Sequence, residues 1–389
     1  MRPTWRDLMM IFMAIHDTFM KVGARTGNGV HGPAADGRAV LDLEDDVVSI
    51  AEALVNVESV SHHEKPLADA VECALRRHDH LTVSRFGNTV VARTSAGRGR
   101  RVVVAGHLDT VPLNANLPAR NDGELLHGLG SCDMKGGVAV ALRIAGSCAD
   151  ALSDLTFIFY ECEEVESTAN GLAKLAEVRP ELLRADLAIL MEPSNGQVEA
   201  GCQGALDFDI KLTGRRAHSA RSWQGINAVE TAAPVLAKLN SFRARTPVVD
   251  GLTYHEGLNA VAIHGGIARN VIPDECHISV NFRFAPDRSE HDAIDFVHNY
   301  FEGHDIVIVD SAPAAPPGLT GTARSFVEAV GKPAQPKLGW TDVARFAQLG
   351  VPALNFGPGD PLLAHTRDEH VPIAQLRMCE NTMREWLTT

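Results

Sequence analysis

Residues 102–112 read V-V-V-A-G-H-L-D-T-V-P, an apolar run that ends in a histidine and an aspartate two positions apart. The run predicts a buried strand over residues 102–105. Because side chains at positions i and i+2 of a strand point to the same face, His107 and Asp109 should leave the strand end side by side. An aspartate beside an imidazole can orient a metal-binding ring. The same pair is equally compatible with an ordinary loop acid beside a surface histidine.

Further apolar runs lie on both sides of this stretch and alternate with helical patterns. The expected strands are 81–85, 89–93, 155–160 and 187–191, and the expected helices are two between residues 43 and 77 and a buried one over 138–145. Apolar strands that alternate with helices indicate an α/β fold with a mostly parallel sheet covered on both faces.

The pattern changes near Gly201 to alternating strands and two amphipathic helices. The elements expected there, in the order β-α-β-β-α-β, are 206–213, 227–240, 260–267, 277–284, 290–302 and 306–309. This order is the split βαβ arrangement of a ferredoxin-like layer. Residues 310–321 have the proline and glycine content of a linker, and α/β character resumes at Ser325. We therefore expect a catalytic domain over residues 41–204 and 316–389, with a domain over residues 205–315 inserted into it.

Composition narrows the class of protein. A chain of 389 residues exceeds the usual size of one hydrophobic core, so two domains are the default expectation. The formal net charge of −13 argues against a nucleic-acid partner, and it means that an anionic ligand must be captured by locally placed arginines. The seven scattered cysteines, with no C-x-x-C pair, indicate reduced thiols and a cytoplasmic location.

The N-terminal segment resembles neither a membrane span nor the rest of the chain. Its apolar run over residues 8–15 is too short to cross a bilayer, so no membrane association is expected. Residues 22–40 are rich in glycine, alanine and polar residues. We interpret residues 1–40 as a disordered or vestigial extension outside the fold.

Six acidic or histidine residues, at five separated positions of the chain, share one context, the end of an apolar strand or a glycine-rich loop. They are His107, Asp133 in G-L-G-S-C-D-M-K-G-G, Glu163 and Glu164 in E-C-E-E, Glu192 in M-E-P-S, and His365 in L-A-H-T-R-D-E. Each position taken alone is more often an ordinary surface residue. Ligands of open α/β sheets gather outside the carboxyl ends of the strands, so all five positions are expected to converge.

Two histidines and several carboxylates suit zinc in a hydrolytic site. If two metal ions lie about 3.5–4 Å apart, one carboxylate must bridge them. That leaves one histidine and one acid for each metal, together with a free carboxylate that can act as a base. The number of residues in the set is sufficient for this arrangement.

The motifs H-L-D-T-V-P, G-L-G-S-C-D-M-K-G-G, E-C-E-E, M-E-P-S, G-R-R-A-H-S-A, R-N-V-I-P-D and L-A-H-T-R-D-E occur in this order. They resemble those of the di-zinc aminoacylase/carboxypeptidase-type metallohydrolases, and the likeness covers nearly everything after residue 41. The resemblance implies two Zn²⁺ ions per subunit, which Co²⁺ can replace. Its implied metal ligands are His107 and Glu192 for one ion, Glu164 and His365 for the other, and Asp133 as the bridge.

The resemblance also implies roles for residues that do not bind metal. Glu163 would be the general base, Asp109 would orient the ring of His107, and a non-proline cis peptide bond would follow Asp133. His218 would reach across a dimer interface to stabilise the oxyanion of the neighbouring subunit, and Asn270 would help to bind substrate. The protein is therefore expected to be a homodimer, with the inserted domain as its dimerisation and lid domain. On the residues alone, His218 is more simply a surface histidine.

The stretches E-A-G-C-Q-G, A-H-S-A-R-S-W, N-F-R-F-A-P-D-R-S and G-W-T-D-V-A-R-F are similar to a branch that removes succinate from an N-succinyl diamino acid. By this resemblance, Arg283 and Arg345 match positions that contact this small anionic substrate, and Thr341 would donate a hydrogen bond to it. An arginine fork suits a carboxylate. The alternative for both arginines is an internal salt bridge. Better-known relatives carry an arginine near Gly201–Gly204, where this chain reads G-C-Q-G, so Arg221 is the candidate to hold the succinyl end.

Other activities on the same scaffold stay open at this point. An acetylornithine deacetylase, another N-acyl-amino-acid amidase or a carboxypeptidase would use the same metal ligands. A glutamate at position 192 fits the deacylase and carboxypeptidase branches of the family. From a different class of function, a metal-free binding protein could be built on the same fold.

Overall fold

The computed structural model describes residues 41–389, so the extension expected over residues 1–40 lies outside the described residues. Between residues 41 and 389, every helix is too short or too polar to span a bilayer. All seven cysteines fall in this range and are free thiols, as expected.

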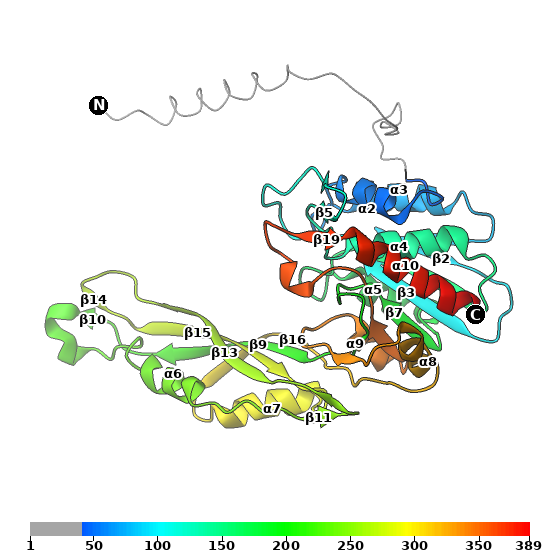
Figure 1. Cartoon of the computed structure of the whole chain (residues 1–389). Helices are drawn as coiled ribbons and strands as arrows, with labels where there is room; N and C mark the ends of the chain where they lie inside the picture. The colour runs from blue at the N-terminus through cyan, green and yellow to red at the C-terminus, as the bar shows by residue number, and fades with distance from the viewer. Residues whose placement is uncertain (1–40) are drawn as a thin grey trace, which may run out of the picture. The chain divides into compact units, whose positions relative to one another are not determined.

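An eight-stranded sheet in the order β1-β2-β6-β3-β7-β18-β8-β17 forms the main layer (Figure 1). Its strands are β1 (Thr82–Phe86), β2 (Thr89–Arg93), β3 (Arg101–His107), β6 (Asp154–Tyr160), β7 (Leu187–Leu190), β8 (Glu199–Ala200), β17 (Gln335–Pro336) and β18 (Ala353–Asn355). The central strands β6, β3, β7 and β18 run parallel. Toward the edges, β1 and β2 pair antiparallel with their neighbours, and β8 pairs antiparallel with β18 but parallel with β17. The sheet is therefore mixed, and the expectation of a mostly parallel sheet holds only for its centre.

Helices cover both faces of this sheet because its central strands are apolar on both sides. In β3, Val102 and Val104 join one hydrophobic core, while Val103 and Ala105 join the other. The helices of the first core are α2 (Val47–Val55), α3 (Lys65–Leu75), α4 (Lys135–Ser147), α8 (Gly321–Val330) and α10 (Ile373–Thr388). The second core is covered by α5 (Gly171–Val178), η1 (Pro180–Leu182) and α9 (Val343–Gln348).

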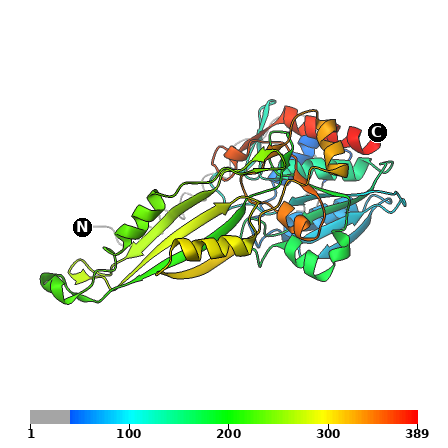
Figure 2. The same cartoon turned by 90° about the horizontal axis from the view of Figure 1, so that it is seen from below.

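A separate four-stranded antiparallel sheet has the order β13-β15-β9-β16. Its elements in chain order are β9 (Gly204–Thr213), α6 (Ala232–Asn240), β13 (Gly257–Gly265), β15 (Glu275–Phe284), α7 (Glu290–Tyr300) and β16 (Asp305–Ala312). Both helices lie on one side of the sheet (Figure 2), where Phe208, Phe282 and Phe301 contribute to a core of their own. The predicted β-α-β-β-α-β order is confirmed. Strand β16 continues into the predicted linker, and α6 begins at Ala232 because residues 227–231 form turns.

Shorter elements complete the described chain. They are β4 (Arg120–Asn121), β5 (Leu125–His127), β10 (Ala217–His218), η2 (Ser219–Gln224), β11 (Val248–Val249), β12 (Leu252–Thr253), β14 (Val271–Ile272), η3 (Pro361–Leu363) and β19 (His370–Pro372).

Candidate metal centre

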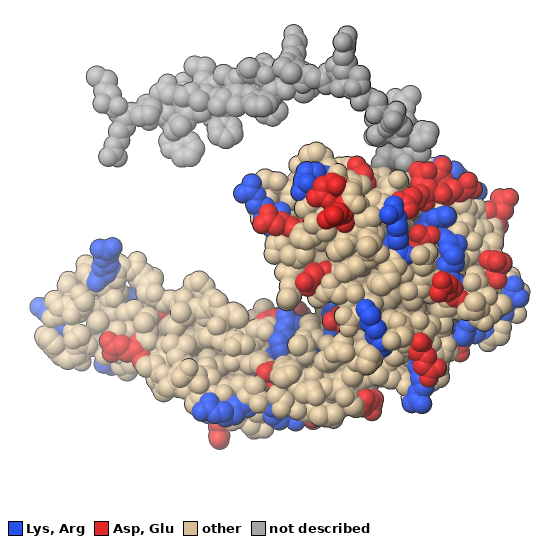
Figure 3. Space-filling view, viewed as in Figure 1, with Lys and Arg blue, Asp and Glu red and all other residues tan. Residues whose placement is uncertain are grey.

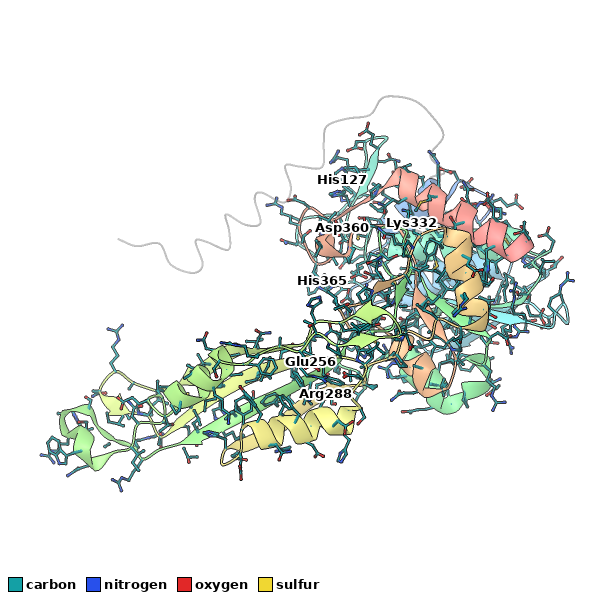
Figure 4. The ribbon with its side chains drawn as sticks, turned by 60° about the horizontal axis from the view of Figure 1, so that its bottom comes forward. His127, Glu256, Arg288, Lys332, Asp360 and His365 are labelled. Atoms are coloured by element: carbon teal, nitrogen blue, oxygen red, sulfur yellow. The ribbon has the colours of Figure 1, made fainter. Side chains whose placement is uncertain are left out.

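The predicted ligands lie at one edge of the large sheet. The neighbouring strands β6, β3, β7 and β18 are parallel, so their carboxyl ends meet at that edge. His107 is the last residue of β3, and Glu192 comes two residues after β7. Glu163 and Glu164 follow β6, and His365 lies in the loop after η3 (Figure 4). The sheet topology therefore brings residues that are far apart in the sequence to one place.

The donor atoms of these residues form two groups that share Asp133. Those of His107, Asp133 and Glu192 lie within 4.8 Å of one another, and so do those of Asp133, Glu164 and His365. Asp133 Oδ1 is 3.2 Å from His107 Nε2, whereas Asp133 Oδ2 is 3.6 Å from His365 Nε2. Glu164 Oε1 lies 3.0 Å from His365 Nε2. Each oxygen of Asp133 therefore faces a different histidine. This is the placement expected of a carboxylate that bridges two cations.

The donor set fits divalent cations. Glu192 is buried, and its Oε1 has no hydrogen-bond partner among residues 41–389. Burial, followed by the proximity of Asp133, raises the pKa of Glu192 to about 8. Removal from water also raises the pKa of Glu163 well above its ordinary value. Imidazole and carboxylate are typical ligands of catalytic zinc, and a cation would offset the charge gathered here.

Both histidine rings lie among acids that favour positive charge. Burial alone would lower the pKa of His107, but hydrogen bonds with Asp109 and Asp133 raise it well above its usual range. The hydrogen bond to Glu164, opposed by partial burial, raises the pKa of His365 to about 9. A metal ion at each ring would supply that positive charge in place of a proton.

Asp109 holds the loop that contains the two glutamates. Its carboxylate accepts the backbone N–H groups of Glu163 and Glu164, both at 3.0 Å, and the hydroxyl of Ser61 at 2.8 Å. The Nδ1 atom of His107 is 3.0 Å from the backbone carbonyl of Asp109 and 3.5 Å from its carboxylate. Asp109 thus contacts both the ring of His107 and the loop that contains Glu163 and Glu164. The sequence predicted the contact with the ring, but not the contact with the loop or the hydrogen bond from Ser61.

Glu369 is a second residue that sequence reasoning missed. Its Oε1 accepts the backbone N–H groups of Cys132 and Asp133, both at 3.0 Å, and its Oε2 accepts that of Gly130 at 2.9 Å. These three bonds fix the loop around Asp133, where the expected cis peptide to Met134 is present. The only sign of Glu369 in the sequence was its position four residues after His365.

Close packing beside Glu192 depends on a glycine. Helix α4 starts two residues after Asp133 and passes the end of β7 so closely that a Cβ on Gly137 would lie 1.9 Å from the carbonyl oxygen of Met191. The buried Lys337 donates to the carbonyl of Pro193, the residue after Glu192, at 3.4 Å and pairs with Glu199 at 2.8 Å. Both features hold the segment that carries Glu192.

The predicted substrate residues are engaged within the protein. Arg345 is ion-paired with Asp342 and donates to Ser167 Oγ at 3.0 Å, so the internal salt bridge considered for it from the sequence is present. Thr341 Oγ1 donates to Asn355 at 3.0 Å. Arg283 donates to Asn281 at 3.2 Å, and Arg221 is exposed in η2. Contact of these four residues with a substrate stays a prediction.

His218 and Asn270 lie beside each other, apart from the ligand group. His218 pairs with Val271 across β10 and β14, and the carbonyl of Asn270 accepts the N–H of Ser219 at 2.9 Å. Both side chains are exposed. Within residues 41–389, no hydrogen bond or ion pair joins His218 to the candidate ligands.

The α/β fold and the donor groups at its strand ends are those of a metal-dependent hydrolase. Residues 103–389 match Peptidase family M20/M25/M40, and the chain belongs to this family.

Particular relatives are similar over almost their full length. A protein of Mycobacterium tuberculosis described as a putative succinyl-diaminopimelate desuccinylase is 49% identical over 352 residues, which covers 90% of this chain and 99% of the relative. The succinyl-diaminopimelate desuccinylase of Corynebacterium glutamicum is 44% identical over 360 residues, covering 90% and 98%. The crystal structure of an M20 family metallo-carboxypeptidase from Sulfolobus solfataricus matches with a TM-score of 0.72 at 14% identity, covering 88% and 99%, which shows a shared fold.

Proposed function

We propose that this protein hydrolyses N-succinyl-LL-2,6-diaminopimelate to succinate and LL-2,6-diaminopimelate, a step in the biosynthesis of diaminopimelate and lysine. The observation that carries the chemistry is the position of Asp133 between two donor groups, each with one histidine and one glutamate. The choice of substrate is supported by the relatives from Mycobacterium and Corynebacterium, which are 49% and 44% identical over nearly their whole lengths.

In this proposal the site would hold two Zn²⁺ ions, which Co²⁺ could replace, with Asp133 as their shared ligand. His107 and Glu192 would hold the first ion, and Glu164 and His365 the second. When bound, such a pair lowers the pKa of a water molecule and polarises the acyl carbonyl.

Glu163 is proposed as the general base. A donor atom of Glu163 lies within 4.8 Å of donors of His107 and Glu164, so its carboxylate is next to both metal groups without being needed as a ligand. Removal from water raises its pKa, which suits a group that must take up a proton near neutral pH and give it back. Its carboxylate would accept the proton of the attacking water and deliver it to the departing amine nitrogen.

The ferredoxin-like segment, residues 205–315, is proposed as an inserted lid domain that forms a homodimer. Strand β13 is at the edge of its sheet and exposes the apolar side chains of Val261 and Ile263. Trp223 and Ile267 of the same segment are also exposed, and the face of this segment in view in Figure 3 is largely uncharged. An unpaired edge with an apolar surface is suited to pairing with a second copy. His218 would then stabilise the oxyanion in the neighbouring subunit.

A substrate panel tests the proposed activity. Metal-free protein is reloaded with zinc and assayed with N-succinyl-LL-diaminopimelate, acetylornithine and a peptide with a free C-terminus. The expected result is the highest kcat/KM on the succinyl substrate and none before zinc is added. A higher kcat/KM on acetylornithine or on the peptide would show that the proposed substrate is wrong, while the hydrolytic chemistry of the family would still apply.

A further inference from the structure

A second group of metal-type donors lies directly before the proposed base. The Sγ atom of Cys162 is 3.3 Å from Glu64 Oε1 and 3.5 Å from His62 Nδ1. Donor atoms of Glu64, Glu161 and Cys162 all lie within 4.8 Å of one another. None of these four residues is among the ligands proposed for the catalytic pair.

Glu64 is only partly satisfied although it is fully buried. Its Oε1 accepts the backbone N–H groups of His62 at 2.9 Å and of Cys162 at 3.2 Å. Its Oε2 is buried and has no hydrogen-bond partner among residues 41–389. A buried carboxylate oxygen without a partner is costly, and a cation bound beside it would remove that cost.

The contacts of Cys162 Sγ have the length of ligand separations in a zinc coordination sphere. Tetrahedral zinc has bonds of about 2.3 Å to sulfur and about 2.0 Å to nitrogen or oxygen, which separates a sulfur ligand from its neighbours by about 3.5 Å. The two contacts of Cys162 Sγ, at 3.3 and 3.5 Å, agree with this separation. His62 is outside the group whose donors all lie within 4.8 Å of one another, so its exposed ring must turn inward to share the cation. The side chain of His62 is exposed, so a cation can enter from solvent on that side.

We propose that Glu64, Glu161 and Cys162 form a third cation site for a borderline-soft divalent metal such as Zn²⁺ or Co²⁺, with the exposed ring of His62 turning inward as the fourth ligand. When the metal binds, the thiol proton of Cys162 leaves to solvent and a sulfur–metal bond forms. Four protein ligands make a closed site of the structural kind. It would join the residue that precedes α3, Glu64, to the loop after β6, and so stabilise the loop that contains Glu163 and Glu164.

Cobalt gives this site a signature of its own. The catalytic pair as proposed has no cysteine ligand, so a thiolate-to-cobalt charge-transfer band in the near ultraviolet would report only the third site. Metal-free protein is titrated with Co²⁺ in the absence of substrate. Wild type should bind three equivalents and develop the band, whereas Cys162→Ser should bind two and lack it. The matched control is Cys148→Ser, a buried cysteine at the end of α4, which should behave as wild type.

A second variant separates loss of the site from loss of the fold. His62 is exposed, so His62→Ala should fold, which circular dichroism can verify. It should weaken the third equivalent of Co²⁺ by about ten-fold or more and leave the first two unchanged. Two equivalents with no band in wild type would overturn the proposal, and so would a band that survives in Cys162→Ser. These readouts need no turnover. A protein that binds three metal ions but does not cleave the succinyl substrate would therefore contradict the proposed function and leave the proposed third site standing.

Discussion

One carboxylate oxygen of Glu369 accepts the backbone N–H of Asp133 at 3.0 Å. The same carboxylate accepts the N–H groups of Gly130 and Cys132, so it holds the whole loop from which the shared ligand projects. Its interaction is with the backbone, so Glu369 is a positioning residue whose effect on the proposed metal pair would be indirect.

We expect Glu369→Gln to lower zinc affinity by about 10–100-fold, because an amide NH₂ would then face a backbone N–H donor. Excess zinc should restore most of kcat. Competition with a chelator measures the affinity, and Glu385→Gln, an exposed glutamate of α10, is the control. Unchanged zinc affinity in Glu369→Gln would show that other contacts fix the loop.

Glu163→Gln tests the base. The amide keeps the shape of the side chain but cannot accept the proton of water, so kcat should fall by about 10²–10⁴-fold while metal content stays at the wild-type level. Steady-state kinetics and metal analysis on the same sample measure both quantities. A kcat of Glu163→Gln near that of wild type would show that Glu163 is not the general base.

Mixed dimers test whether His218 acts on the neighbouring subunit. Glu163→Gln and His218→Ala should each be nearly inactive alone. When equal amounts are dissociated and reassociated, half of the dimers carry one intact site, and activity should recover to about a quarter of wild type. If His218 served its own subunit, the mixture would stay as inactive as its components, and if it served neither, His218→Ala alone would keep its activity.

Gly137→Ala tests the packing behind Glu192. The added methyl group would meet the carbonyl of Met191, so helix α4 must shift, and the free energy of unfolding should fall by about 1–3 kcal/mol. Gly99→Ala is the matched control, since a Cβ there meets nothing within 4 Å. Urea unfolding of both variants measures the difference. Equal stabilities would mean that the region absorbs the shift without strain.

The placement of the ligands was predictable because it follows from one rule, that parallel strands end at a common edge. His107, Glu164 and Glu192 each follow an apolar strand that the sequence displays clearly. The function of Glu369 was not predictable, because its partners are backbone N–H groups of a distant loop and leave no pattern of side chains.

The errors in the fold also have physical reasons. Strands β8 and β17 contain two residues each, which is too few to show the alternation of apolar and polar side chains. The mixed edge of the sheet could therefore not be predicted from the sequence. Residues 227–231 continue the amphipathic pattern of α6, but the side chain of Asn227 accepts the N–H of Val229 and favours a turn instead. The ion pair of Arg345 with Asp342, three residues earlier, was one of two possibilities that the sequence left open.

His365 contacts Glu164, which lies 201 positions earlier in the chain. A ribosome makes His107 and the acidic members of the proposed centre first, then the whole ferredoxin-like segment, and only afterwards the second histidine. A nascent or prematurely terminated chain therefore holds the negative groups without the residue that completes them. Loading of the second proposed metal ion is thus tied to the end of synthesis, and fragments released before His365 should remain inactive even in excess zinc.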